Sequence, residues 1–281
     1  MRIRIIGLSI LTVVASAAAV LVAAPAQAVV GLTYATSVTV SDSASSKSLA
    51  VACPSGKVAI GGGAYITGAI GSASIRQLRP GQVLGFNFLS VIAQEDPDGY
   101  AGSWSLSATA VCIPPPAGLS YVTATVSDPS LVWATASCGA QRIIGHGYTV
   151  SDTALAMAAG AEIDVRNRAY LSVEPSQVPG AVTPLTGTAV AVCANAALPG
   201  LTQVTVATAT NSVNGKSATA ACPAGTQVIG VNGDLFDWRR HTVIDDLTLN
   251  SAANSVTVTG YEDQLGNPLN WTAEASALCA T

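Results

Sequence analysis

Most of the chain is made of short runs in which β-branched and small polar residues alternate. Two clear examples are residues 122–126 (Val-Thr-Ala-Thr-Val) and 204–208 (Val-Thr-Val-Ala-Thr). A period of two is typical of a strand with one buried and one exposed face. Beyond the first 28 residues, the run 153–159 is the one segment compatible with a short helix. The pattern therefore predicts an all-β protein.

These strands recur in three units of about 82–87 residues, which we assign to residues 31–117, 118–199 and 200–281. Each unit opens on Gly-Leu and contains a strand ending in Cys, a tight turn, a short apolar strand and a glycine patch. A variable stretch and two further strands follow, so we expect five to six strands per unit. The turn and patch are Cys-Pro-Ser-Gly-Lys-Val-Ala-Ile-Gly-Gly-Gly from Cys53, with a similar copy from Cys222 and a degraded one from Cys138. A fixed long period predicts copies packed on one another, because the joins are short and contain Pro.

The glycine patches favour a structural interpretation. A phosphate-binding loop needs a helix after it, whereas the patch at Gly61, Gly62 and Gly63 lies between strands. Glycine at a bulge or at a close approach of two backbones explains the pattern better. We also expect the Gly of Pro-x-Gly to occupy a turn position with positive φ.

Six cysteines allow 15 pairings, and the repeat favours one pair within each unit. The expected bridges are Cys53–Cys112, Cys138–Cys193 and Cys222–Cys279. Each would tie the second strand of its unit to the last, and closing a loop of nearly sixty residues stabilises by roughly 4 kcal/mol. Head-to-tail pairing between units is the alternative.

The first 28 residues resemble a secretory signal. Arg2 and Arg4 precede an apolar run at residues 5–22, and Ala26-Gln27-Ala28 fits the small-x-small cleavage rule. We predict cleavage after Ala28 and an extracellular protein with no integral membrane segment; the alternative is an uncleaved anchor helix. Disulfides suit the same compartment.

Composition narrows the range of partners. The formal net charge is −4, and loss of Arg2 and Arg4 would make it two units more negative. An acidic surface argues against nucleic acid and anionic membranes as partners. Neither His146 nor His241 has the neighbours of a zinc site, no nucleophile elbow is present, and disulfides leave no thiolate. We therefore expect no metal, no cofactor and no enzymatic activity.

Acidic turns precede the last strand of two units, at Glu95-Asp96-Pro97-Asp98-Gly99 and Glu262-Asp263-Gln264-Leu265-Gly266. Each supplies two or three carboxylates, whereas Ca²⁺ takes six to eight oxygens, so calcium binding stays open. Paired acids are also used by glycosidases, which makes a hydrolase the third functional hypothesis. Acidic hairpin loops are the simpler interpretation.

The segment richest in chemistry lies in the variable stretch of the third unit. Aromatic rings next to arginines and acids suit recognition of a glycan or an extracellular protein. The candidate binding residues are Phe236, Asp237, Trp238, Arg239, Arg240 and His241. The alternative is a solvated hairpin with Trp238 folded onto the sheet. Trp104 and Trp271 hold a repeated strand position and are expected in the core.

The Cys-Pro-x-Gly and Gly-Gly-Gly motif, a later Trp and a final Cys-Ala resemble repeats of secreted bacterial proteins that are mostly uncharacterised. The second unit departs from the pattern, with Gly139 for Pro and Leu185 for Trp. Similar modules look like ones at the ends of fibre-like chains, which implies that three copies would form a pseudo-trimer with threefold pseudosymmetry. The leading functional hypothesis is surface binding; a structural protein that assembles through its sheet faces is the runner-up.

Overall fold

The computed structural model describes residues 29–129, 132–150, 156–164, 167–175, 184–237, 241–262 and 266–281. Its elements are eighteen strands, six per unit, as the all-β prediction requires. Within these ranges no helix is long and apolar enough to cross a membrane.

The first unit contains β1 (Thr33–Val38), β2 (Ser46–Ala52), β3 (Val58–Thr67), β4 (Ala73–Val83), β5 (Phe86–Glu95) and β6 (Ser105–Ile113). The second contains β7 (Ser120–Asp128), β8 (Val132–Ser137), β9 (Arg142–Val150), β10 (Ala156–Asp164), β11 (Arg168–Pro175) and β12 (Leu185–Ala194). The third contains β13 (Thr202–Ala207), β14 (Lys216–Ala221), β15 (Gln227–Phe236), β16 (Thr242–Asn250), β17 (Ser255–Glu262) and β18 (Thr272–Ala280).

The short helix considered for residues 153–159 is wrong over the part that is described. Ala156 begins strand β10, which pairs with β11. The variable stretch therefore holds the fourth strand of the second unit, and the same stretch holds β4 and β16 in the other two. Pairing with neighbouring strands outweighs the local preference of an alanine-rich run for helix.

Each sheet is built from two units. The three sheets have the orders β1-β6-β3-β16-β17-β14, β13-β18-β15-β10-β11-β8 and β2-β5-β4-β9-β12-β7. We call them sheets 1–3, 3–2 and 2–1 after the units that contribute their halves. In every sheet the first, sixth and third strands of one unit join the fourth, fifth and second strands of another. The units are thus interlocked, and the three sheets have the same topology.

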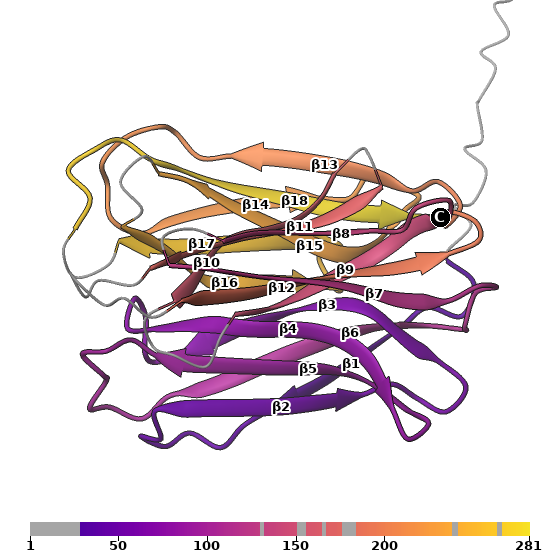
Figure 1. Ribbon diagram of the computed structural model, residues 1–281, viewed down its shortest axis with the longest axis horizontal. Coiled ribbons are helices and arrows are strands. Elements are labelled where there is room, and N and C mark those ends of the chain that lie inside the picture. Colours follow the sequence, from indigo (N-terminus) through magenta and orange to yellow (C-terminus); the bar gives the residue numbers. More distant parts are fainter. Residues whose placement is uncertain are drawn as a thin grey trace, which may run out of the picture.

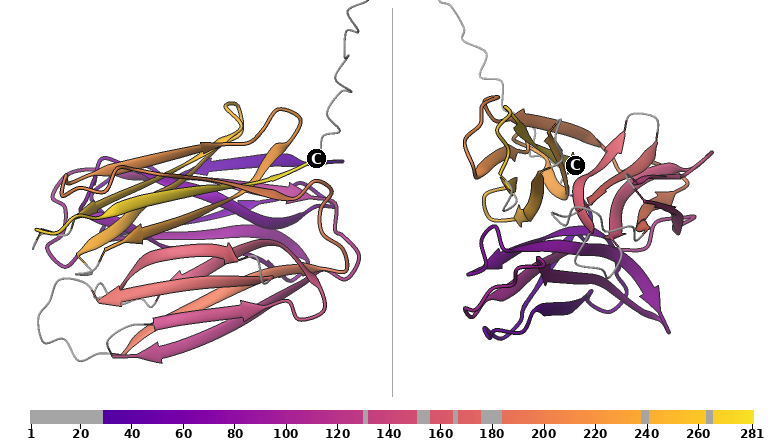
Figure 2. Two further views of the ribbon diagram at one scale, coloured as in Figure 1. Left: turned by 90° about the horizontal axis from the view of Figure 1, so that it is seen from above. Right: turned by 60° about the vertical axis from the view of Figure 1, so that its left-hand side comes forward.

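The two halves of a unit pack face to face, although they belong to different sheets. Figure 1 shows β2 and β5 of the first unit lying below β3 and β6, and Figure 2 shows three groups of strands, one per unit, around a common centre. The core between the halves of the first unit includes the fully buried Leu89 and Leu106. The arrangement has the threefold pseudosymmetry expected of three packed units.

The glycine patches lie where the third strands of the units meet. A side chain on Gly145 of β9 would come within 1.8 Å of the carbonyl oxygen of Ile60 in β3. One on Gly61 would lie 3.5 Å from the carbonyl of His146 and 3.8 Å from that of Ile229. The registers of β3 and β15 also shift by one residue just before Gly61 and Gly230. Close backbone approach and a bulge, as predicted, account for the patch.

The three disulfides are the expected pairs, with Cα–Cα distances of 5.6–5.7 Å. Because the second and last strands of a unit belong to different sheets, each bridge joins two sheets, and together the bridges link all three in a ring. The glycines of the two Pro-x-Gly turns have positive φ, as predicted: Gly56 (76°) and Gly225 (96°). In the second unit Gly139, which replaces the Pro, also has positive φ (58°).

Candidate functional site

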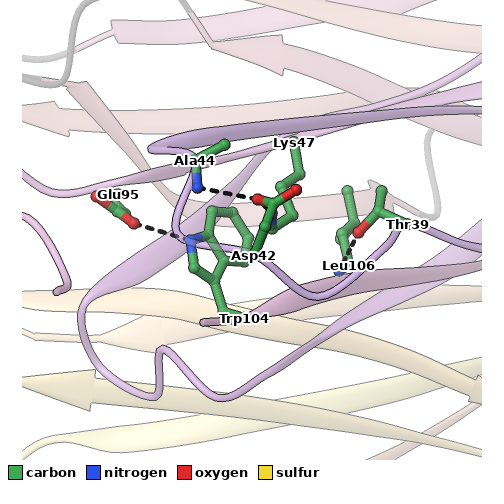
Figure 3. Close-up of polar contacts among 7 residues, drawn as sticks. All are labelled: Thr39, Asp42, Ala44, Lys47, Glu95, Trp104 and Leu106. Atoms are coloured by element: carbon green, nitrogen blue, oxygen red, sulfur yellow. Dashed lines mark hydrogen bonds and ion pairs between the residues drawn. The ribbon is translucent and has the colours of Figure 1, made fainter. Parts of the chain in front are cut away.

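A buried polar cluster lies at one end of the first unit (Figure 3). The Lys47 ammonium lies 4.8 Å from the ring centre of Trp104 and forms an ion pair with Asp42. The Trp104 indole N–H donates to Glu95 Oε1 at 2.8 Å. The bond from Lys47 and the backbone N–H of Ala44 lower the pKa of Asp42. Lys47, Trp104 and Glu95 are all buried, so these three side chains belong to the core, whereas Asp42 lies at the surface.

The third unit repeats this cluster. Lys216 lies 4.7 Å from the ring centre of Trp271, whose indole N–H donates to Glu262 Oε1 at 2.9 Å. Asn211 replaces Asp42, and its side-chain oxygen accepts from Lys216 Nζ at 2.7 Å. Desolvation lowers the pKa of Lys216. Both tryptophans lie in the core, as the sequence predicted.

The acidic turns are held by the same two glutamates. Glu95 Oε2 accepts the backbone N–H of Tyr100 at 3.2 Å, and Glu262 Oε2 accepts that of Asn267 at 3.1 Å. Each glutamate thus binds its own loop through one oxygen and its tryptophan through the other. In the described part of the chain, no three His, Cys, Asp or Glu side chains are placed to hold a metal ion.

The predicted binding segment is described only at its two ends. Phe236 ends β15 with 52% of its surface exposed. Asp237 accepts hydrogen bonds from the Asn267 side chain and from the backbone N–H of His241, and His241 lies outside the strands. Trp238, Arg239 and Arg240 lie outside the described residues. The interpretation of Trp238 as folded onto the sheet therefore stays a prediction.

Phe236 belongs to a larger arrangement on the outward face of sheet 3–2. One row of register neighbours crosses five strands: Trp133, Ser172, Gly160, Asp234 and Glu274. Trp133 is 61% exposed, while Val132 and Ala134 on either side of it are buried, which identifies the outward face. Phe236 is two residues beyond Asp234 on the same face of β15.

The adjacent row adds a second aromatic residue and a third acid. Tyr170 lies between Thr135 and Glu162 in the register, and the Arg168 guanidinium lies 4.7 Å from its ring centre. The Asp234 carboxylate lies over Gly160, since a side chain on Gly160 would come within 2.8 Å of one of its oxygens. The face therefore combines Trp133, Tyr170 and Phe236 with carboxylates, and it takes residues from two units.

Burial and the two glutamates raise the pKa of Asp234. Burial, together with the negative charges of Glu162 and Glu274, raises the pKa of Asp234 to about 7. Burial also raises the pKa of Glu274. Asp234 is thus near half-protonation at neutral pH and can both donate and accept hydrogen bonds.

The corresponding positions in the other two sheets differ. Sheet 2–1 has Thr149 and Gln77 in place of Asp234 and Gly160, with Arg79 in place of Glu162. In sheet 1–3 the positions of Asp234 and Gly160 are taken by Tyr65 and Asp246. Asp246 Oδ1 accepts the backbone N–H of Ile66 at 2.7 Å, and burial raises its pKa to about 6. The combination of aromatic residues and three carboxylates is therefore specific to sheet 3–2.

The sequence pointed to Phe236 and to the segment that begins at Asp234, but it did not single out Trp133, Tyr170, Glu162 or Glu274. The available signal for Trp133 was the alternation of the strand before Cys138. It places Trp133 on the face of the strand away from Val132 and Ala134, which are buried. Asp234 lies 101 residues from Trp133, in another unit, and only the pairing of β10 with β15 brings the two strands into one sheet.

The remaining candidate, His146, is buried where β9 approaches β15. Its Nε2 lies 3.0 Å from the carbonyl oxygen of Val231, and desolvation lowers its pKa to about 4. It occupies the position of Gly62 and Val231 in the other units, as expected for a residue that fills a repeat position. His146 is part of the centre of the molecule and not of a surface site.

No protein-family model matches the chain, and no curated protein matches it in sequence.

Proposed function

We propose that the protein is a secreted, non-enzymatic binding protein that recognises a glycan on the outward face of sheet 3–2. The observation that carries the proposal is the row from Trp133 to Glu274, in which an exposed indole and two carboxylates share one face of the sheet. Neither of the other two sheets has this combination at the corresponding positions.

The chemistry of the face matches a sugar ring. Exposed aromatic rings offer apolar area to the C–H face of a saccharide, and Trp133 and Tyr170 lie in neighbouring rows on adjacent strands. Carboxylates accept hydrogen bonds from sugar hydroxyls, and an Asp234 near half-protonation also donates. The face holds its side chains on paired strands, so little ordering is needed on binding.

Export is the second part of the proposal. Three disulfides are consistent with an oxidising compartment, and the first 28 residues have the composition of a signal peptide. An acidic chain meets extracellular glycans without competition from nucleic acids. N-terminal sequencing of protein recovered from the culture medium tests this part: we expect the chain to begin at Val29.

A glycan array followed by titration of the best ligand tests the binding site. Trp133→Ala should weaken binding at least about tenfold, as loss of a central aromatic contact does. Tyr65→Ala is the matched control, because Tyr65 is 42% exposed but lies in sheet 1–3. Equal affinity of the two variants would rule out this face as the site.

One observation favours assembly as a second function. The β4–β5 hairpin of the first unit ends in a two-residue turn and exposes Val83, Leu84 and Phe86 at its tip. Such apolar residues mark protein contacts when they cluster. Sedimentation at high concentration tests this alternative: a self-associating wild type and a monomeric Phe86→Ser variant would support assembly, and a strictly monomeric wild type would oppose it.

A further inference from the structure

Two tyrosine hydroxyls form hydrogen bonds between neighbouring units. The Tyr34 hydroxyl, at the start of the first unit, donates to the carbonyl oxygen of Val228 in the third unit at 2.6 Å. The Tyr121 hydroxyl, at the start of the second unit, donates to the carbonyl oxygen of Ala59 in the first unit at 2.9 Å. Burial raises the pKa of each tyrosine to about 12. Two of the three junctions between units are therefore filled by a phenol ring.

The third junction lacks this ring. Gln203 occupies the tyrosine position in β13, since Tyr34, Tyr121 and Gln203 pair with the residue just before the last Cys of their unit. An open surface pocket of about 460 Å³ lies beside Gln203, between the third and the second unit; it is called the cavity below. Its lining includes Arg142, Ile143, Ile163, Leu201, Gln203 and Leu278.

The carbonyl that would accept a tyrosine hydroxyl is still in place. Ala59 and Val228 each pair with the last Cys of their unit, and Ile143 holds the same register position opposite Cys193. Ile143 also lines the cavity. The third junction thus keeps the acceptor and the apolar walls of a phenol site.

We propose that this cavity binds a small phenol, whose ring replaces the tyrosine of the other two junctions and whose hydroxyl donates to the Ile143 carbonyl. The proposal is independent of the glycan site, because Trp133 and the acid row do not line the cavity. A concave site that has apolar walls and a few polar groups is the usual form of a small-molecule site, and here its shape follows from the missing ring. The volume is within the range of small-molecule sites and leaves room for a substituted ring.

The cavity also suits a phenol better than a plain hydrocarbon. Ile143, Ile163, Leu201 and Leu278 provide apolar walls, while polar atoms of Arg142 and Gln203 border them. A ring with one hydroxyl satisfies both kinds of surface, since the ring displaces water and the hydroxyl reaches a main-chain acceptor.

Calorimetric titration with 4-methylphenol tests the proposal, with toluene as the control ligand. We expect one site per chain and about tenfold tighter binding of the phenol, the difference of one hydrogen bond. Gln203→Tyr should abolish this binding and raise Tm, because it fills the cavity as Tyr34 and Tyr121 fill theirs. Undiminished binding to Gln203→Tyr would overturn the proposal, as would no binding to the wild type at millimolar phenol.

A second variant covers the case in which Gln203→Tyr does not fold. Tyr34→Gln opens the corresponding space at the junction with the third unit, next to the Val228 carbonyl. We expect this variant to bind two molecules of 4-methylphenol per chain instead of one. An unchanged stoichiometry would mean that the tyrosine position does not determine the site.

Discussion

The second unit differs from the first and third at the end where they have a buried Lys, Trp and Glu. Val132 stands where the others have Lys47 and Lys216, and Leu185 stands where they have Trp104 and Trp271. At the position of Glu95 and Glu262, strand β11 has Pro175. All three polar positions have changed together, although the topology of the unit has not.

This difference predicts that the buried Lys, Trp and Glu behave as one group. A buried ammonium or carboxylate without its partners costs several kcal/mol, whereas replacing all partners by apolar residues is often neutral. The fold of a unit therefore does not need these three side chains; of the cluster, the second unit keeps only Asp128, at the position of the exposed Asp42. The same unit supplies Trp133, Tyr170 and Glu162 to the outward face of sheet 3–2, so the unit that has departed most from the repeat carries the most distinctive surface.

The largest expected effect comes from breaking the cluster in the first unit. Trp104→Leu introduces the residue of the second unit but leaves the buried Glu95 carboxylate without its indole donor. We expect a loss of about 3–5 kcal/mol in the free energy of unfolding, measured by urea denaturation at pH 7.

A double-mutant cycle sharpens this test. Glu95→Leu alone leaves the indole N–H unpaired, and Trp104→Leu with Glu95→Leu removes both polar groups. The double variant should lose about 1–3 kcal/mol less than the sum of the two single variants. Additive losses would mean that the cluster is not a unit and that the second unit lost its members independently.

The next effect concerns His146, which the second unit places at the centre where the others have Gly62 and Val231. Its pKa is lowered to about 4 by burial, from an ordinary value of 6.5. Between pH 4 and pH 6.5 the His146 imidazole is therefore protonated in the unfolded chain but neutral in the folded chain. The contribution of His146 to the free energy of unfolding is full above pH 6.5 and falls by about 3 kcal/mol as the pH is lowered to 4.

The acids of the outward faces act in the opposite direction. Asp234 and Asp246 have pKa values raised to about 7 and 6, so their contribution grows as the pH falls. The effect of His146 is isolated by comparing the wild type with His146→Val, which carries the residue of the third unit. The stability difference between the two proteins should shift by about 3 kcal/mol in favour of the variant from pH 7 to pH 4. A difference that does not change with pH would contradict a buried neutral His146.

Most features that the sequence predicted correctly depend on contacts inside one unit; the glycine patch, which lies where the units meet, is the exception. The spacing of Cys53 and Cys112, the turn glycines and the core position of Trp104 follow from the order of strands along the chain. These signals are local, or repeat at a fixed distance, and they need no knowledge of how the units meet.

The features that could not be predicted from the sequence depend on strand pairing between units. The fourth strands lie in the stretch that varies most, and they join a neighbour over few residues, such as Leu247 opposite Ala64. A short pairing between distant segments has no periodic signal in the chain. The sequence therefore pointed to Phe236, in a segment dense in chemistry, but not to Trp133, which reaches the same face only through β10 and β15.

The smallest expected effect on stability is that of Trp133→Ala, and it completes the comparison between the units. Trp133 and Trp104 are the same kind of side chain, but Trp133 is 61% exposed and Trp104 is fully buried. Because Trp133 gains little from folding, its loss should change the free energy of unfolding by about 0.5 kcal/mol or less in the same urea titration. A binding role predicts this combination of a near-neutral effect on folding and a large effect on glycan affinity. A loss of stability as large as that of Trp104→Leu would instead assign Trp133 to the packing of the second unit, and the outward face of sheet 3–2 would lose its main support as a binding site.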